Sequence, residues 1–598
     1  MLPYISNIPR ESSISVDRFG GINVKDDISF GECISCCDVS PSSYPLISSR
    51  KKRSLCSRCD GIINGVGSCD GFFYTYYKDE PKGIFLCFKG KNYEFTNLSE
   101  SKDYTSKRQF AVLKTAIVII PDNVIFHIDT LKFSRINVNQ SYKKSDIATK
   151  FNAEGLTSSM LDYKNDDKRG LFTSSSIYSH VKSYIYDGYK REFYTLSFAD
   201  DLSVGDVVKL KLNITVDALE VSDEYYAYLN KLRTEGIMVK IKGKTVKTHY
   251  TPVGYITETT GLSFEGSVLN TQGYANIYFT DFSIERTMPK ATSIAAFNNR
   301  IWAVGEGGIY ASKLGTPTVW NDFAVDSFGT LPASSFSTVA GSEGNFTAII
   351  PHGNYIYAFK ENHIHKIYGD TPDEYKISGI EAPGCTKNPY TVSVCGSYLM
   401  YASKSGICVL KEGYPKIISE RIGNVDALCG ASCGNIYYFI SQKNLERVIY
   451  VYDMEHNVWT MQSCGKNANH LCSDGNDVCY AEAGELIYLT SDKGEEYEKN
   501  VCWRFRLRFE RGGFGDDTAL STNIKISLGK DASCTAFAIY DDDTRGAVAG
   551  CLYDETACGN CVIRLPVKRD AGFSIEFKGV GEFTMKSIKF NYYKSYNE

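Results

Sequence analysis

The sequence predicts an all-β protein, a β-propeller with an inserted β-rich domain and a C-terminal β-sandwich. One observation is a repeat of short apolar runs broken by Asn and Gly turns. Its period is about 40 residues, which is typical of propeller blades. The other observation is the composition, because 42 Tyr, 32 Phe and 50 Gly occur beside only 8 Met. Such usage favours strands and turns over helical bundles.

Composition also limits the classes of function. A chain of 598 residues is too long for one hydrophobic core, so several domains are expected. The net charge of -4 argues against a protein that holds nucleic acid by a basic surface. We find no secretory signal and no apolar run long enough to cross a bilayer. We therefore expect a protein made in a reducing cytosol, with most of its 20 Cys as free thiols.

Five segments follow from where the repeat starts, stops and resumes. In chain order they are an N-terminal arm with short strands (1–60), the first propeller blades (61–131), the inserted domain with one helix (132–290), the remaining blades (291–500) and the sandwich (501–598). The blade pattern is clear at 117–120 and 124–126. These two apolar runs are joined by Asp122 and Asn123, residue types that tolerate the backbone of a tight turn.

The inserted segment differs from its surroundings in rhythm and composition. It contains none of the Cys residues, although seven precede it and thirteen follow it. From Ser222 to Gly236 the pattern predicts a helix, with Ser222 as N-cap, Asp223 and Glu224 in the first turn, and Gly236 as the stop. The strand-like runs lie at 207–212, 238–241, 262–268 and 275–279.

The stretch 293–323 is the clearest blade, with apolar runs separated by Asn298-Asn299 and by a Gly-rich turn. Comparable strands are centred on Trp302, Tyr357, Met400, Tyr438 and Cys479. Counting the repeats predicts about seven blades, with six to eight allowed. A blade cannot bury both of its faces alone, so the ring must close to be stable.

Beyond residue 501 the repeat is lost, and the pattern predicts a sandwich. The run 503–509 alternates large apolar residues with Arg, as a half-buried strand does. Five similar runs follow at 524–528, 535–540, 563–567, 573–577 and 585–592.

Cysteine spacing supplies the one candidate metal site. Cys33 with Cys36, and Cys56 with Cys59, have the spacing of a four-thiolate zinc site. The alternative is chance spacing in a Cys-rich stretch. His363 and His365 would place two imidazoles on one face of a strand. No third ligand is evident for them, so an exposed strand face is the alternative.

The charged run from Arg50 to Arg53 has two interpretations, a nucleic-acid patch or a surface turn. No catalytic constellation is found. The sequence lacks the zinc-protease helix motif and the phosphate-binding loop. It also lacks the repeated aspartate box of sialidases. We therefore predict a non-enzymatic protein without a resident cofactor, zinc apart.

Three regions resemble propeller-bearing tail nozzle or tail-stabilisation proteins of tailed bacteriophages. The first joins residues 19–23 to Gly31-Glu32 and Arg50. The second, and most specific, runs from Phe297 through Arg300 and Trp302 to Ser312, Pro317 and Trp320. The third joins 503–506 to 573–581 and 588–592. The resemblance does not extend to residues 132–290.

The resemblance implies a virion structural protein, assembled in the host cytoplasm and located in the tail. It implies a homo-oligomeric ring, with a hexamer favoured, around a channel for transiting DNA. The implied partners are other tail proteins, on the adaptor or portal side and among the tail fibres, and no membrane-spanning segment is expected. Two alternatives stay open, a tail-tip protein that binds the host surface and a propeller glycosidase. The glycosidase would need two carboxylates facing a sugar.

Overall fold

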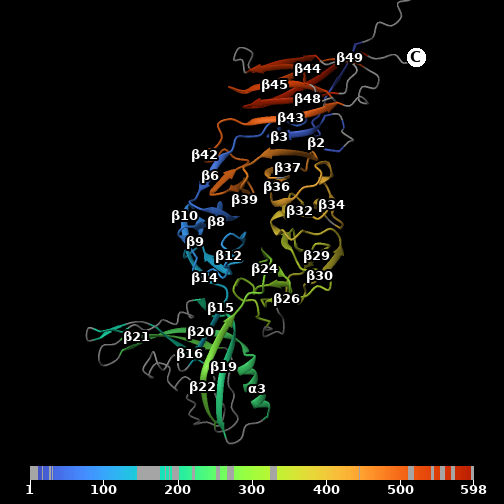
Figure 1. The fold of residues 1–598 in the computed structure, drawn as a ribbon. Coiled ribbons are helices and arrows are strands. Elements are labelled where there is room, and N and C mark those ends of the chain that lie inside the picture. The colour runs from blue at the N-terminus through green and yellow to red at the C-terminus, as the bar shows by residue number, and fades with distance from the viewer. Residues whose placement is uncertain are drawn as a thin grey trace, which may run out of the picture.

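The computed structural model is a β protein with three parts, a sandwich, a propeller and a projecting inserted domain (Figure 1). This arrangement confirms the predicted fold class. The structure describes residues 11–16, 18–25, 29, 31–143, 176–181, 184–186, 189–191, 201–218, 223–250, 256–264, 275–323, 333–411, 413–443, 445–509, 518–540, 545–552, 559–566 and 573–593.

The described residues form seven antiparallel blades. Those before the insertion are β7 (Ile62–Ser68), β8 (Phe72–Asp79), β9 (Lys82–Phe88) and β10 (Lys91–Glu94), then β11 (Gln109–Leu113), β12 (Ala116–Ile120), β13 (Val124–His127) and β14 (Lys132–Arg135). The third blade has β23 (Ser293–Phe297), β24 (Arg300–Gly305), β25 (Gly308–Ala311) and β26 (Phe336–Thr338), and the fourth has β27 (Ala348–His352), β28 (Tyr355–Phe359), β29 (His363–Tyr368) and β30 (Lys376–Glu381).

Two further blades have four strands each. The fifth has β31 (Ser393–Cys395), β32 (Tyr398–Ser403), β33 (Gly406–Leu410) and β34 (Lys416–Ile417), and the sixth has β35 (Ala427–Cys433), β36 (Ile436–Lys443), β37 (Glu446–Asp453) and β38 (Val458–Ser463). Short 3-10 turns η3 (Pro389–Thr391) and η4 (Ser419–Arg421) precede the fifth and sixth blades. The first strand of each blade lies innermost in the ring.

The seventh blade closes the ring with a strand from the other end of the chain. It consists of β39 (Ala468–Ser473), β40 (Val478–Glu482), β41 (Glu485–Tyr488), β6 (Ser54–Arg58) and β42 (Glu495–Glu496). Strand β6 pairs with β41 on one side and β42 on the other. Residues 54–58, which the sequence places in the N-terminal arm, therefore belong to the propeller. Residues 132–135 likewise end the second blade as β14 rather than starting the insertion.

The inserted domain is a long antiparallel sheet that leaves the propeller between its second and third blades (Figure 1). Its sheet order is β15 (Val138–Lys143), β22 (Ala275–Arg286), β19 (Val207–Ala218), β20 (Ile237–Tyr250), β21 (Ile256–Phe264) and β16 (Ser176–Val181). A small hairpin adds β17 (Tyr184–Tyr186) and β18 (Tyr189–Arg191). The predicted helix is present as α3 (Asp223–Thr234), which packs on β19. Gly236 follows it with φ +79°, as a helix stop requires.

A buried ion pair fixes the base of the inserted domain. The Arg286 guanidinium pairs with the Asp206 carboxylate, and both side chains are almost fully buried. Arg286 also donates to the carbonyl oxygens of Ile136 at 2.8 Å and Arg135 at 2.7 Å. Thr318, in the loop after β25, donates to Asp206 at 3.1 Å. The second and third blades are thus tied to the insertion through this ion pair, the second by Arg286 and the third by Asp206.

The sandwich is built from both ends of the chain. One six-stranded sheet contains β1 (Glu11–Ser15), β4 (Val39–Ser40), β5 (Ser48–Ser49), β49 (Phe583–Tyr593), β44 (Thr518–Leu528) and β47 (Asn560–Pro566). The other contains β2 (Gly21–Ile22), β3 (Glu32–Cys37), β43 (Cys502–Phe509), β48 (Phe573–Val580), β45 (Ser533–Tyr540) and β46 (Arg545–Leu552). A 3-10 turn η1 (Pro41–Ser43) links β4 to β5. The sequence did not predict β46 or the role of the N-terminal strands.

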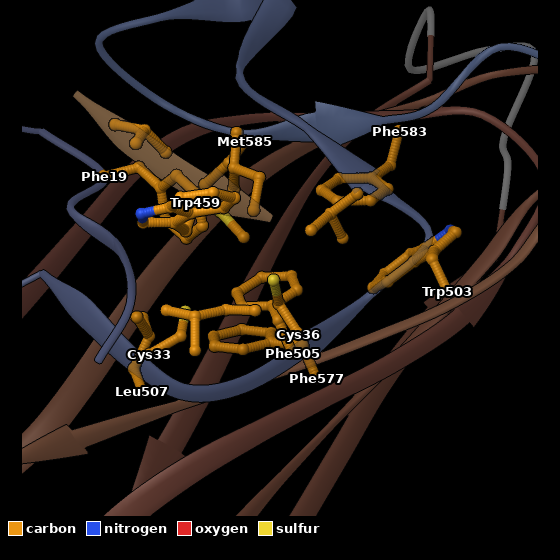
Figure 2. Packing of buried hydrophobic residues seen from close by; sticks show 14 of the residues in the cluster. Phe19, Cys33, Cys36, Trp459, Trp503, Phe505, Leu507, Phe577, Phe583 and Met585 are labelled. Carbon is orange, nitrogen blue, oxygen red and sulfur yellow. The ribbon is translucent and has the colours of Figure 1, made fainter. Parts of the chain in front are cut away.

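One hydrophobic cluster joins the sandwich to the propeller. Figure 2 shows Trp459 of β38 beside Phe19 and Met585, with Trp503, Phe505 and Phe583 in the same cluster. The ring centroids of Trp503 and Phe583 are 3.9 Å apart. Burial of large aromatic side chains contributes strongly to stability. The sandwich and the propeller therefore share one hydrophobic core instead of being joined only by a linker.

Candidate functional site: the mouth of the propeller

The innermost strands contain no acidic residue. Their sequences are IINGVGS, QFAVL, SIAAF, AIIPH, SVC, ALCGASC and ANHLCS, all within the described part of the chain. Glycoside hydrolysis commonly uses two carboxylates facing the scissile bond. The seven strands that line the centre of this propeller do not supply that pair.

The ends of these strands meet across the ring. Lys107 lies between the first and second blades, two residues before β11, and Tyr390 lies in η3, between the fourth and fifth blades. The Tyr390 hydroxyl donates to the Lys107 carbonyl at 3.0 Å. The Lys107 amine donates to the Leu428 carbonyl of the sixth blade at 2.9 Å and lies 5.0 Å from the centroid of the Tyr390 ring. Segments from opposite sides of the propeller thus bridge its centre.

We call this group the propeller mouth, defined by Lys107, Tyr390, Leu428, Arg447 and His470. The ring of His470, the third residue of β39, lies edge-on to Tyr390 with centroids 6.4 Å apart. Arg447, at the start of β37, donates to the Ala468 carbonyl at 2.6 Å. Burial, with the positive charges of Lys107 and Arg447, holds the pKa of His470 well below its ordinary value. Burial also lowers the pKa of Lys107, and the charge of Arg447 adds to this effect.

A second arginine holds the segment that carries Lys107. Arg108 and Asp122 form an ion pair at 3.0 Å, with both side chains fully buried. Arg108 also donates to the carbonyl of Tyr104 at 2.7 Å, and Ser99 donates to Asp122. The Arg108 amide donates to the Asn64 carbonyl at 2.8 Å. These bonds order the segment after β10 against the first two blades, so Lys107 is presented from a fixed backbone.

The structure does not bring the zinc candidates together. Cys33 and Cys36 lie on β3 in the cluster that joins sandwich and propeller (Figure 2). Cys56 and Cys59 pack in a different cluster, between the seventh and first blades. Burial raises the pKa of the Cys33 and Cys36 thiols, and so opposes the thiolate form that zinc requires. Across the described residues no group of three or more His, Cys, Asp or Glu could hold a metal ion.

Both interpretations of the charged run from Arg50 to Arg53 are wrong for its two arginines. Arg50 and Arg53 are buried. Arg50 contacts Asp38 at 2.5 Å, and its two terminal nitrogens donate to Glu498 at 2.7 and 2.9 Å. Asp38 accepts from Ser463 of the sixth blade at 2.6 Å. The run therefore supplies an ion network at the junction of sandwich and propeller.

The two histidines of β29 also differ from expectation. His365 is buried and bonds Ser342 through Nε2 at 2.8 Å, so that part of the strand face is not exposed. Burial, then the charges of Lys360 and His363, lowers the pKa of His365 to about 4. Among the described residues no third ligand completes a metal site with His363.

The most specific part of the phage resemblance forms one structural unit. Arg300 is buried and donates to the carbonyls of Ser312, at 2.8 Å, and Ser334. Ser312 accepts from the Ile301 amide at 3.0 Å, and Trp320 donates to the Pro317 carbonyl at 2.9 Å. The motif holds residues 312–320 and Ser334 against the strands of the third blade. It has a folding role in this chain and does not line the mouth.

No sequence pattern indicated the mouth residues. Lys107, Tyr390, Arg447 and His470 occur in four separate segments and fit no local motif. The available signal was their place in the repeat. Lys107, Tyr390 and His470 lie near the beginning of an innermost strand, and Arg447 lies at the hairpin between the second and third strands of its blade. That signal is readable only after every blade has been assigned its strand order.

Comparison with known proteins identifies no family for this chain. No family model and no curated protein sequence matches it. Similar solved structures include an exo-β-1,3-galactanase from Phanerochaete chrysosporium, with 11% identity over 50% of this chain and 95% of that one, at a TM-score of 0.21. An acylaminoacyl peptidase from Pyrococcus horikoshii has 10% identity over 75% of this chain and 58% of that one, with a TM-score of 0.28.

A glycoside hydrolase family 43 arabinoxylan arabinofuranohydrolase from Bacillus subtilis has 10% identity over 59% of this chain and 92% of that one, with a TM-score of 0.15. Similarity of this degree carries no argument about what the present chain does. As for membranes, no helix in the described ranges is long and apolar enough to span one.

Proposed function

We propose that this protein is a non-enzymatic structural component of a bacteriophage tail, a subunit of a ring around the DNA channel. The proposal rests on the three regions of resemblance in the sequence. The first and the third of these regions lie in the sandwich, and the second lies in the third blade. It is supported by the kind of contacts that these regions make. They stabilise the junction and the blade, as expected of a rigid building block rather than of a catalytic centre.

The observation that carries the non-enzymatic part is the composition of the propeller centre. The innermost strands carry no carboxylate, and Lys107 and Tyr390 bridge the mouth. A glycosidase that used the centre of this ring could not take its acid or its nucleophile from these strands. The glycosidase alternative would therefore have to take its carboxylates from loops or place its site elsewhere on the molecule.

The bridged mouth also bears on where DNA would pass. A DNA duplex is about 20 Å wide. The side chain of Lys107 crosses the centre of the propeller to reach Leu428, so this centre is too narrow for a duplex. In the proposed assembly DNA passes between copies of the chain and not through a propeller. A net charge of -4 suits that role, because each cationic phosphate contact would add salt-sensitive affinity and retard passage.

The sandwich offers the edge through which copies would meet. Val548 and Leu552 of β46 and Val562 of β47 are 59%, 73% and 56% exposed. Strands β46 and β47 are the last strands of their sheets and contact one another. An exposed apolar sheet edge is a site for association. In a closed ring such an edge meets a different patch of the next copy.

Native mass determination of the purified chain tests the ring. We expect a closed oligomer, and the substitution Leu552→Asp should shift it to smaller species without unfolding the chain. Tyr414→Asp, at an exposed position in the propeller, is the matched control and should leave the oligomer intact. A wild-type monomer that hydrolyses surface glycans would overturn the proposal in favour of the glycosidase.

The host-binding alternative has one observation in its favour. The inserted domain projects away from the propeller, at the end opposite the sandwich (Figure 1). A projecting domain can reach a receptor. If this alternative holds, the isolated full chain should bind whole host cells, and a chain without residues 138–286 should not.

A further inference from the structure

Two cations meet at the propeller mouth without a carboxylate partner. Lys107 and Arg447 are both partly buried, and neither takes part in an ion pair found among the described residues. Their known partners are neutral carbonyls, Leu428 for Lys107 and Ala468 for Arg447. Removing cations from water without an opposite charge is unfavourable, so this arrangement favours an added negative charge.

A buried imidazole nitrogen without a partner is the second observation at the propeller mouth. His470 is 4% exposed, and its Nε2 has no hydrogen-bond partner within the part of the chain that the structure describes. Buried polar groups in folded proteins nearly always have partners, so an unpaired one indicates a missing ligand or water. His470 is linked to both cations through groups that lie between them, and the charges of both cations act on it. Its ring packs on Tyr390, which covers Lys107, and Arg447 bonds the carbonyl two residues before it.

The remaining donors suit an anion. A lysine amine has three N–H groups, and one is engaged by Leu428. A guanidinium has five, and one nitrogen of Arg447 is engaged by Ala468. Neutral His470 can donate from Nε2 in the appropriate tautomer. Carbonyl oxygens, the usual ligands of cations, already accept from Lys107 and Arg447.

We propose that the propeller mouth binds a small inorganic anion of halide size, held by Lys107, Arg447 and His470. The anion offsets part of the positive charge of Lys107 and Arg447 and gives His470 Nε2 an acceptor. Its ligands come from the segment before β11, from the hairpin before β37 and from β39. It therefore joins the second, sixth and seventh blades at their common centre. The site does not depend on the proposed role in a phage tail.

Thermal unfolding in chloride tests the site in solution. A ligand bound only by the folded state raises the melting temperature with the logarithm of its concentration. At constant ionic strength, with glutamate as the replacing anion, the melting temperature of the wild type should rise with chloride from about 0.01 M to about 1 M. Lys107→Met and Arg447→Gln should abolish most of that rise. Lys102→Met, at an exposed position on the same segment, should retain it.

Crystals soaked in bromide give the direct readout and do not require a variant to fold. An anomalous peak in contact with Lys107 Nζ, Arg447 and His470 Nε2 is the expected result. The absence of bromide at the mouth of the wild type would overturn the inference. So would a chloride dependence in Lys107→Met and Arg447→Gln equal to that of Lys102→Met.

Discussion

At the residue scale, Trp302 of β24 shows how a blade is stabilised. It is 1% exposed and packs against Phe336 and Tyr375, with ring centroids 5.9 and 5.2 Å away. We predict that Trp302→Ala lowers the free energy of unfolding by about 3–5 kcal/mol, because it removes a buried ring and leaves a cavity. Urea unfolding followed by tyrosine fluorescence or circular dichroism would measure the change.

Tyr414→Ala is the control for this prediction, since Tyr414 is 67% exposed. Its effect should stay within about 0.5 kcal/mol, the range of ordinary surface substitutions. A loss below about 1 kcal/mol for Trp302→Ala would contradict the burial of this residue between neighbouring blades.

Asp38 gives a prediction that depends on pH. Its burial alone would raise the pKa of the carboxyl, but the charge and hydrogen bonds of Arg50 outweigh burial and hold the pKa below its ordinary value. The stabilisation is therefore present above about pH 4 and is lost as pH falls through the depressed value. Asp38→Asn should cost on the order of 3 kcal/mol at pH 7, because Arg50 loses one of its two carboxylate partners.

The free-energy difference between wild type and Asp38→Asn should shrink as pH falls below about 4. Urea midpoints at several pH values for both chains would measure it. A difference that stays constant from pH 7 down to pH 3 would show that Asp38 does not act through its charge.

Little of the candidate site could be predicted from residue types alone. The Cys spacing of 33–36 and 56–59 predicts a four-thiolate site, yet the two pairs lie in separate hydrophobic clusters. Spacing along the chain says nothing of which strands become neighbours. Similarly, Arg50 and Arg53 look like surface charges until Glu498, more than 400 residues away in sequence, is placed beside them.

At the scale of elements, β6 is the strand that closes the ring. Leu55 pairs with Ile487 of β41 on one side and with Glu495 of β42 on the other. Leu55→Pro should destabilise the chain by roughly 1–3 kcal/mol or more, because it removes an amide donor and leaves a paired carbonyl unsatisfied. Thermal unfolding would detect the loss.

Leu55→Ala separates backbone from side-chain effects, since it keeps the amide. It should be clearly less damaging than Leu55→Pro because Leu55 is only partly buried. Equal losses for the two variants would mean that hydrogen bonding by β6 does not hold the ring closed.

The inserted domain should be removable. Ile136 and Met288, on either side of it, are buried in the core shared by the second and third blades. The Met288 amide donates to the Asn137 side chain at 2.7 Å, so the two ends are adjacent. Replacing residues 138–286 with a short Gly/Ser linker should leave a soluble chain that unfolds cooperatively, as insertions at loop tips allow. A chain without cooperative unfolding would contradict this prediction.

Elements inside the repeat were predictable, and elements joined over long distances were not. The hairpins of each blade follow from local turns such as Asn298-Asn299, both with positive φ. The helix α3 follows from its first-turn acids and from Gly236. By contrast, β1 pairs with β49 and β6 with β41, partners at the far end of the sequence. No local pattern encodes such pairing.

At the scale of the whole molecule, the two ends of the chain determine its shape. N-terminal strands enter both sheets of the sandwich and then the seventh blade. Gly21, with φ +79°, lies so close to the backbone of Trp459 that a Cβ there would approach its oxygen to 2.7 Å. Together with the Asp38, Arg50 and Glu498 network, this contact packs the sandwich directly against the propeller.

The central claim is that this chain is a structural protein of a phage tail. Immunogold electron microscopy of particles purified from cells that produce the chain tests it most directly. The account predicts gold label confined to the tail of intact particles. Label spread over the capsid, or chain found only free of particles, would contradict it.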